Sequence, residues 1–155
     1  MNGVLDVSKY IISNYWKSGK TITNLKLQKV LYYVQGYTLK RCNEIMFPEA
    51  IYKWPYGPVV AEAYFAYNDA GAAPLREPTG SELQKSLMRI DRDPLFRSII
   101  DIVAKYTYDL TSTELVSKTH SEYPWKSVDD REIISVRTIA HYFYANDPLG
   151  IEDTN

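Results

Sequence analysis

Apolar residues recur at spacings of three and four along residues 23–41, and this pattern predicts a helix. The positions that share its apolar face are Leu27, Val30, Leu31, Val34 and Tyr37. Thr23 or Asn24 can cap the helix start, because either side-chain oxygen can accept an unpaired backbone N–H. Amides and tyrosines flank the apolar face, so little of this helix is left for water. We therefore expect it near the centre of the domain.

The face opposite the apolar one is basic and aromatic. Its members are Lys26, Lys29, Tyr33, Gly36 and Lys40. We expect the lysines and Tyr33 to be exposed, since the core does not need this face. Gly36 costs a helix about 1 kcal/mol relative to alanine, so we interpret it as a point where another backbone passes close by.

The same periodicity predicts further helices, and their boundaries carry recognisable start signals. We expect them at residues 4–16, 59–68, 81–88, 94–108, 111–120 and 136–145. The predicted caps are Ser81, Asp93 before Pro94, the Thr111–Glu114 capping box, and Ser135. The fold class is therefore mainly α: a compact single-domain helical fold of about six to seven helices.

A different pattern occupies residues 45–54. Alternating side chains predict a short extended segment at 51–54, with residues 45–47 as its candidate partner in a two-stranded β element. The stretch Trp54-Pro55-Tyr56-Gly57-Pro58 follows, and its prolines and glycine predict a rigid turn. Pro58 suits the first position of the next helix, where its missing N–H costs nothing.

Length and charge add limits to this picture. A chain of 155 residues predicts one domain, which we place at residues 1–147, with an acidic tail at 148–155 that we expect to fray. The net charge is −1. Residues 1–53 nevertheless carry eight Lys and Arg against three Asp and Glu, and residues 109–155 carry four against nine. Packing of one end on the other would cancel this asymmetry; otherwise two faces of opposite sign remain.

Several classes of function find no support in the sequence. The single Cys42 allows no internal disulfide, and the two histidines with it form no zinc pattern. No glycine-rich loop follows a strand, so no nucleotide cofactor is expected. We interpret Asp93 as a helix cap, and Asp129 and Asp130 as a solvated or helix-start charge pair, and predict no metal. No apolar run approaches 18 residues, so we expect a cytoplasmic protein without a membrane partner.

His120 is the one residue whose side chain suggests acid–base chemistry. It precedes Glu122, Pro124 and Trp125, but only Cys42 and tyrosine hydroxyls are available as nucleophiles, and nothing in the sequence pairs them with it. We favour a structural histidine at a helix end that bonds a carbonyl and packs on an aromatic ring. The lysine row likewise resembles a sparse phosphate-binding patch, but a solvated helix face is the simpler interpretation and a nucleic-acid partner is not favoured.

Three stretches, in this order, resemble the SocA-like, or Panacea, antitoxin domain, whose members are often described as phage-associated, GepA-like proteins. They are Lys26-Leu27-Gln28-Lys29-Val30-Leu31-Tyr32-Tyr33-Val34-Gln35-Gly36, Trp54-Pro55-Tyr56-Gly57-Pro58-Val59, and Leu115-Val116-Ser117-Lys118-Thr119-His120-Ser121-Glu122-Tyr123-Pro124-Trp125. The resemblance covers nearly the whole chain. One departure is Pro55, because the family more often has a charged or polar residue before the tyrosine of the turn.

The resemblance implies a mostly helical domain that neutralises a cognate toxin protein by binding it. At least one SocA-type protein acts as an adaptor that delivers its toxin to a ClpXP-type protease, so direct blocking and proteolytic delivery both stay open. The family has no defined catalytic residues, and it implies no enzyme and no cofactor. The alternatives from other classes are a small cytoplasmic enzyme that uses His120 in a tyrosine-lined cleft and a nucleic-acid-binding regulator.

The family motifs supply two sets of candidate residues. The candidates for partner binding lie on the basic helix row and the rigid turn: Lys26, Lys29, Tyr33, Trp54 and Tyr56. The candidates for structural roles are Leu27, Gln28, Leu31, Tyr32, Gln35, Gly36, Gly57, Pro58, His120, Pro124 and Trp125. Tyrosine and tryptophan often anchor interfaces, and a rigid turn loses little entropy when it binds.

Overall fold

The computed structural model describes residues 2–152 and shows the mainly helical fold that the sequence predicts. Its helices are α1 Val4–Lys17, α2 Asn24–Cys42, α3 Ala61–Ala66, η1 Asn68–Ala70, α4 Gly80–Asp91, α5 Pro94–Thr107, α6 Ser112–His120, α7 Tyr123–Lys126 and α8 Val136–Ala145. The short α7 was not expected, since no helix was predicted between residues 120 and 136. None of the helices among residues 2–152 has the length and apolar character needed to cross a bilayer.

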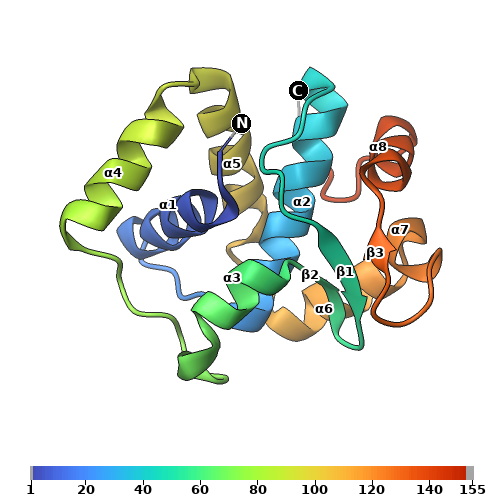
Figure 1. Ribbon diagram of the computed structural model, residues 1–155, viewed down its shortest axis with the longest axis horizontal. Helices are drawn as coiled ribbons and strands as arrows, with labels where there is room; N and C mark the ends of the chain where they lie inside the picture. The colour runs from blue at the N-terminus through green and yellow to red at the C-terminus, as the bar shows by residue number, and fades with distance from the viewer. Residues whose placement is uncertain (1, 153–155) are drawn as a thin grey trace.

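The central helix α2 stands in the middle of the molecule (Figure 1). Helices α1, α4 and α5 lie on one side of it, and the sheet, α7 and α8 lie on the other. Fifteen of the 19 residues of α2 are buried, on every face of the helix. Leu27 and Leu31 lie in the core, as expected, and the predicted central position of this helix is confirmed.

A small antiparallel sheet packs beside α2. Strand β1, Ile51–Trp54, lies between β2, Gly57–Val59, and β3, Ile133–Ile134. The predicted strand at residues 45–47 is wrong. The side chain of Gln35 instead accepts a hydrogen bond from the Met46 N–H at 2.7 Å and donates one to the Phe47 carbonyl at 2.9 Å. These backbone groups are thus satisfied without a partner strand.

Pro58 lies in β2 and does not start a helix, so this prediction is also wrong. The chain reverses at Pro55 and Tyr56, and Trp54 then pairs with Gly57. Gly57 has a φ of +115°, which only glycine adopts readily. Helix α3 consequently begins at Ala61, two residues after β2 ends.

Most of the predicted helix caps are confirmed. The side chains of Thr23, Asp93 and Ser135 each accept a hydrogen bond from a backbone N–H in the first turn of the following helix. Thr111 and Glu114 form the reciprocal capping box. The Ser81 cap is wrong, because α4 already begins at Gly80, with Thr79 before it.

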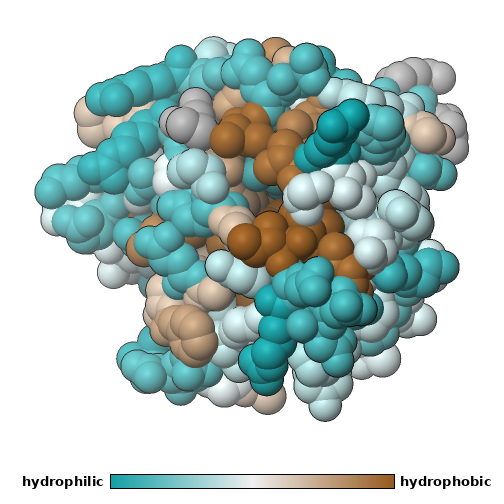
Figure 2. Space-filling view, turned by 45° about the vertical axis from the view of Figure 1, so that its right-hand side comes forward, coloured by the Kyte–Doolittle hydropathy of each residue, from teal (hydrophilic) through white to brown (hydrophobic). Residues whose placement is uncertain are grey.

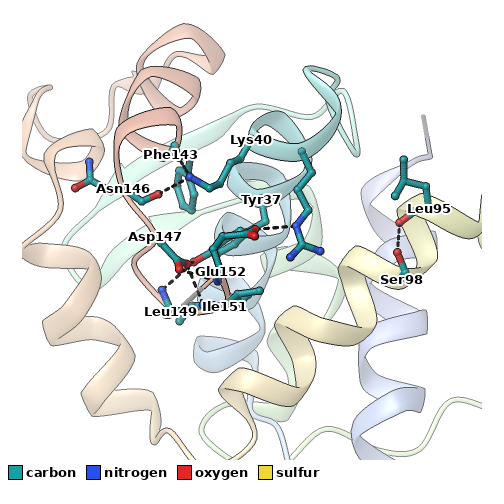
Figure 3. Close-up of polar contacts among 11 residues, drawn as sticks. Tyr37, Lys40, Leu95, Ser98, Phe143, Asn146, Asp147, Leu149, Ile151 and Glu152 are labelled. Atoms are coloured by element: carbon teal, nitrogen blue, oxygen red, sulfur yellow. Dashed lines mark hydrogen bonds and ion pairs between the residues drawn. The ribbon is translucent and has the colours of Figure 1, made fainter. Parts of the chain in front are cut away.

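The segment after α8 folds back onto α2 (Figure 3). The Tyr37 hydroxyl donates to Asp147 Oδ1 at 2.5 Å and accepts from the Leu149 N–H at 2.9 Å. Asp147 also accepts from the N–H groups of Ile151 and Glu152 at 3.0 and 2.7 Å. These bonds connect residues 149–152 to Tyr37 and Asp147, residues 153–155 lie outside the described residues, and the expected fraying of the tail stays a prediction. The expected domain boundary at residue 147 stays a prediction.

Basic side chains from the first third of the chain reach acidic groups and carbonyls of the last third. Lys20 pairs with Asp109 and Arg41 pairs with Glu152, each at 2.9 Å. Lys40 donates to the Phe143 carbonyl at 2.8 Å. The charge asymmetry of the sequence is thus reduced by packing one end on the other, the first of the two alternatives.

Substitution of Gly36 tests the packing of α8 on α2. A Cβ at this position would lie 2.3 Å from the Phe143 ring, so a side chain, not a backbone, makes the close approach. Alanine in a helix interior normally gains up to about 1 kcal/mol over glycine. We predict the opposite sign here: Gly36→Ala should lower the free energy of unfolding in urea, by about 1–3 kcal/mol.

The matched control combines Gly36→Ala with Phe143→Leu, which removes the ring that the new methyl group meets. In the Phe143→Leu background, Gly36→Ala should therefore lower the free energy of unfolding by less than it does in the wild type. A Gly36→Ala protein more stable than the wild type would contradict the packing of α8 on α2.

Candidate functional site

The β1–β2 hairpin and α3 carry a cluster of aromatic side chains. The Trp54 ring packs edge-on against Tyr64 and Phe65, with centroid distances of 5.0 and 6.0 Å. Phe65 is 63% exposed, and Tyr56 at the hairpin tip is 68% exposed. Large aromatic groups that remain this open on a surface are the kind that anchor protein interfaces.

A groove of about 280 Å³ opens beside this cluster, and we call it the aromatic groove. It is lined by Asn24, Leu25, Gln28, Trp54, Pro55, Tyr56, Val59, Tyr64, Asn68, Gly71 and Ala72, none of which is charged. Pockets for drug-sized ligands usually hold about 300–1,000 Å³. The aromatic groove lies just below the lower end of this range.

Two amides of α2 fix the walls of the aromatic groove from beneath. Gln28 donates to Asn24 Oδ1 at 2.9 Å and accepts from the Val60 N–H at 3.0 Å. Asn24 donates to the Tyr64 carbonyl at 3.0 Å. The start of α3 is thereby tied to the first turns of α2.

Lys29 holds the hairpin against α2 in a similar way. Its side chain is fully buried, and its Nζ donates to the Pro58 carbonyl at 3.2 Å. Burial lowers the pKa of this amine to about 7. A Cβ on Gly57 would lie 2.6 Å from Lys29 Cε, so only glycine lets the hairpin come this close.

The predicted exposure of the basic helix row is wrong, because Lys26 and Tyr33 are buried too. Lys26 is 5% exposed, donates to the Tyr108 carbonyl at 3.1 Å, and lies 5.0 Å from the centre of the Tyr15 ring. Burial lowers its pKa to about 8. These lysines serve backbone carbonyls inside the fold, so the phosphate-binding interpretation loses its geometric basis. Of the five partner-binding candidates, Trp54 and Tyr56 remain at the surface.

Glu122 is a buried carboxylate that the sequence interpretation did not select. It accepts hydrogen bonds from the hydroxyls of Tyr32 and Tyr33 at 2.9 and 2.7 Å. Burial raises the pKa of Glu122, and the two hydroxyls act against this rise. The arrangement ties the start of α7 to α2. The sequence did contain a signal for this site: Glu122 lies in the third family stretch, and two adjacent tyrosines, Tyr32 and Tyr33, lie in the first.

His120 stacks on Trp125, with ring centroids 4.0 Å apart and an angle of 20° between the planes. The predicted packing on an aromatic ring is thus confirmed. Burial lowers the pKa of His120, the Pro55 carbonyl opposes this, and the charges of Lys29 and Lys53 add to it. Its Nε2 is buried and has no hydrogen-bond partner among residues 2–152. The Glu122 carboxylate, two residues further along the chain, accepts hydrogen bonds from Tyr32 and Tyr33.

The indole of Trp125 completes the support of the hairpin. Its Nε1 donates to the Trp54 carbonyl at 2.9 Å, and the Lys53 amine lies 4.1 Å from the centre of its ring. Pro124 is buried beside it at the start of α7. The stretch 115–125 therefore supports the hairpin stretch 54–59 through Trp125.

The amide of Gln28 offers a direct test of this bracing. Gln28→Leu should leave the buried Val60 N–H without an acceptor, at a cost of about 1–3 kcal/mol in unfolding free energy. Gln84→Leu, on the exposed face of α4, is the matched control and should stay within about 0.5 kcal/mol of the wild type. Equal, small effects in urea titrations of both variants would show that Gln28 does not support the groove.

Comparison with known proteins adds the family. A family model described as antitoxin SocA-like, Panacea domain, matches residues 27–126. No curated protein and no solved structure matches the chain. The matched region spans most of α2, the hairpin, α3 and the braces from α6 and α7. The chain belongs to the SocA-like, Panacea-domain antitoxin family.

Proposed function

We propose that this chain neutralises a cognate toxin protein by binding it through the aromatic groove and the aromatic side chains beside it. Membership of the family supports an antitoxin role and favours a function without catalysis. The observation that carries the proposal is the pairing of exposed aromatic groups, Tyr56 and Phe65, with a groove of uncharged lining.

The support beneath the hairpin makes this surface suitable for tight binding. Lys29, Gln28 and Trp125 each hold a backbone group of the hairpin or of the segment that follows it. A surface ordered in advance loses little conformational entropy on association. Most of the affinity would then come from burying a few aromatic side chains, because a small number of anchor residues supplies most of the binding energy at protein interfaces.

The uncharged lining also indicates what the partner presents. An apolar or aromatic side chain can fill the groove without leaving a charge desolvated. The buried lysines Lys26 and Lys29 cannot steer an acidic partner, contrary to the basic face expected from the sequence. We therefore expect an apolar anchor on the toxin, inserted between the hairpin tip and α3.

Co-expression with a cognate toxin tests the proposal. The double variant Tyr56→Ala, Phe65→Ala removes two exposed rings and should keep the fold. We predict that its affinity for the toxin falls at least tenfold, because truncation of each hot-spot side chain costs about 2 kcal/mol or more. Co-expression of this variant should no longer rescue growth. Tyr144→Ala, an exposed aromatic on α8, is the matched control and should rescue growth fully.

A folded double variant that still rescues growth and binds with unchanged affinity would refute the proposed surface. A purified toxin assay without a protease separates two modes of neutralisation. Direct blocking should inhibit the toxin in that assay. Delivery to a ClpXP-type protease should inhibit it only when the protease and ATP are added.

A further inference from the structure

We infer that Lys29 is a proton-operated latch: its neutral amine holds the β1–β2 hairpin against α2, and protonation of the amine favours release of the hairpin. The latch acts on the part of the molecule that carries Trp54 and Tyr56. Its relevance to binding rests on the proposed function, whereas the latch itself is a property of the isolated chain.

The geometry around Lys29 leaves a charge no adequate partner. The side chain is fully buried, and its one hydrogen bond within the described part of the chain goes to the neutral carbonyl of Pro58. Among residues 2–152, none of the ion pairs includes Lys29. A buried ammonium without a counter-ion is costly, so the charged form must either be hydrated or change its surroundings.

The titratable groups nearby do not supply the missing negative charge. The charges of Lys29 and of Lys53 on β1 both lower the pKa of His120 on α6, so these neighbouring groups are basic and offer no negative charge. Strand β2 itself contributes only Gly57, Pro58 and Val59. The buried carboxylate Glu122 is bonded to Tyr32 and Tyr33, which lie on α2 with Lys29.

The hairpin is the element that can move to admit water. Helix α2 is enclosed on every face, whereas the hairpin tip at Pro55 and Tyr56 is exposed. Separation of β2 from α2 would hydrate the Lys29 amine and would also free the buried Nε2 of His120. The contact between the Trp125 indole and the Trp54 carbonyl would break in the same motion.

The direction of the pH effect follows from proton linkage. The closed hairpin holds the pKa of Lys29 at about 7, below the ordinary 10.5 that a hydrated amine regains in the open state. Between these two values the open state binds one more proton than the closed state. Opening should therefore become about tenfold more frequent for each unit of decrease in pH over that range, and level off below pH 7.

Hydrogen exchange at the tryptophan indoles measures this opening in the isolated chain. The protection factor, which corrects for the intrinsic pH dependence of exchange, should fall about tenfold per unit of decrease in pH between 9 and 7 for the Trp125 indole. The Trp16 indole of α1, which donates to the Leu75 carbonyl and not to the hairpin, is the internal control and should not follow this slope. In Lys29→Met the Trp125 slope should disappear.

Three results would overturn the latch: a flat Trp125 protection factor in the wild type, the same slope at Trp16, or an unchanged slope in Lys29→Met. If Lys29→Met does not fold, NMR titration of the Lys29 Cε resonance in the wild-type chain decides. A midpoint near 7 supports the latch and a midpoint near 10.5 contradicts it. None of these readouts involves the toxin, so their failure leaves the proposed function to its own test.

Discussion

The structure depends on one arrangement: a helix buried on every face whose polar side chains bind the backbone of irregular segments around it. Gln35 accepts a hydrogen bond from a backbone N–H of the loop after α2, and Gln28 accepts one from the N–H just before α3. Lys29 donates a hydrogen bond to a backbone carbonyl of β2. Buried backbone N–H and carbonyl groups need such partners, and a three-stranded sheet this short supplies few. The polar residues of α2 therefore stabilise segments that secondary structure alone would leave unpaired.

This arrangement separates the residues that support the candidate surface from those that form it. Lys29, Gln28 and Trp125 act beneath the hairpin and the segment after it. Tyr56 projects from the hairpin tip and Phe65 from α3. The supports can stay the same while the projecting groups vary, so one scaffold can present different side chains. Apolar side chains also gather near the middle of the face shown in Figure 2. Among the exposed apolar groups of the chain, Ile133 of β3 is 53% exposed. Strand β3 is therefore a second exposed apolar site with which the aromatic groove can be compared.

Periodicity and cap chemistry predicted most of the helices, because both are local properties of the chain. Asp93 and Thr111 cap their helices as expected. Long-range contacts were not predictable in this way. Lys26 and Lys29 have the spacing of a solvated face, yet their long stems reach carbonyls 82 and 29 residues away. Only the tertiary fold shows which carbonyls lie within reach. Tyr64 and Phe65 were missed as surface groups for the same reason, since their place beside Trp54 depends on the hairpin.

The central claim is that the toxin docks on the aromatic surface that α2 supports from within. The most direct measurement is amide hydrogen exchange of the chain with and without its cognate toxin, read by mass spectrometry. The account predicts new protection in peptides covering residues 54–72, with little change in residues 129–137 around β3. Protection confined to residues 129–137, with the hairpin unchanged, would contradict it.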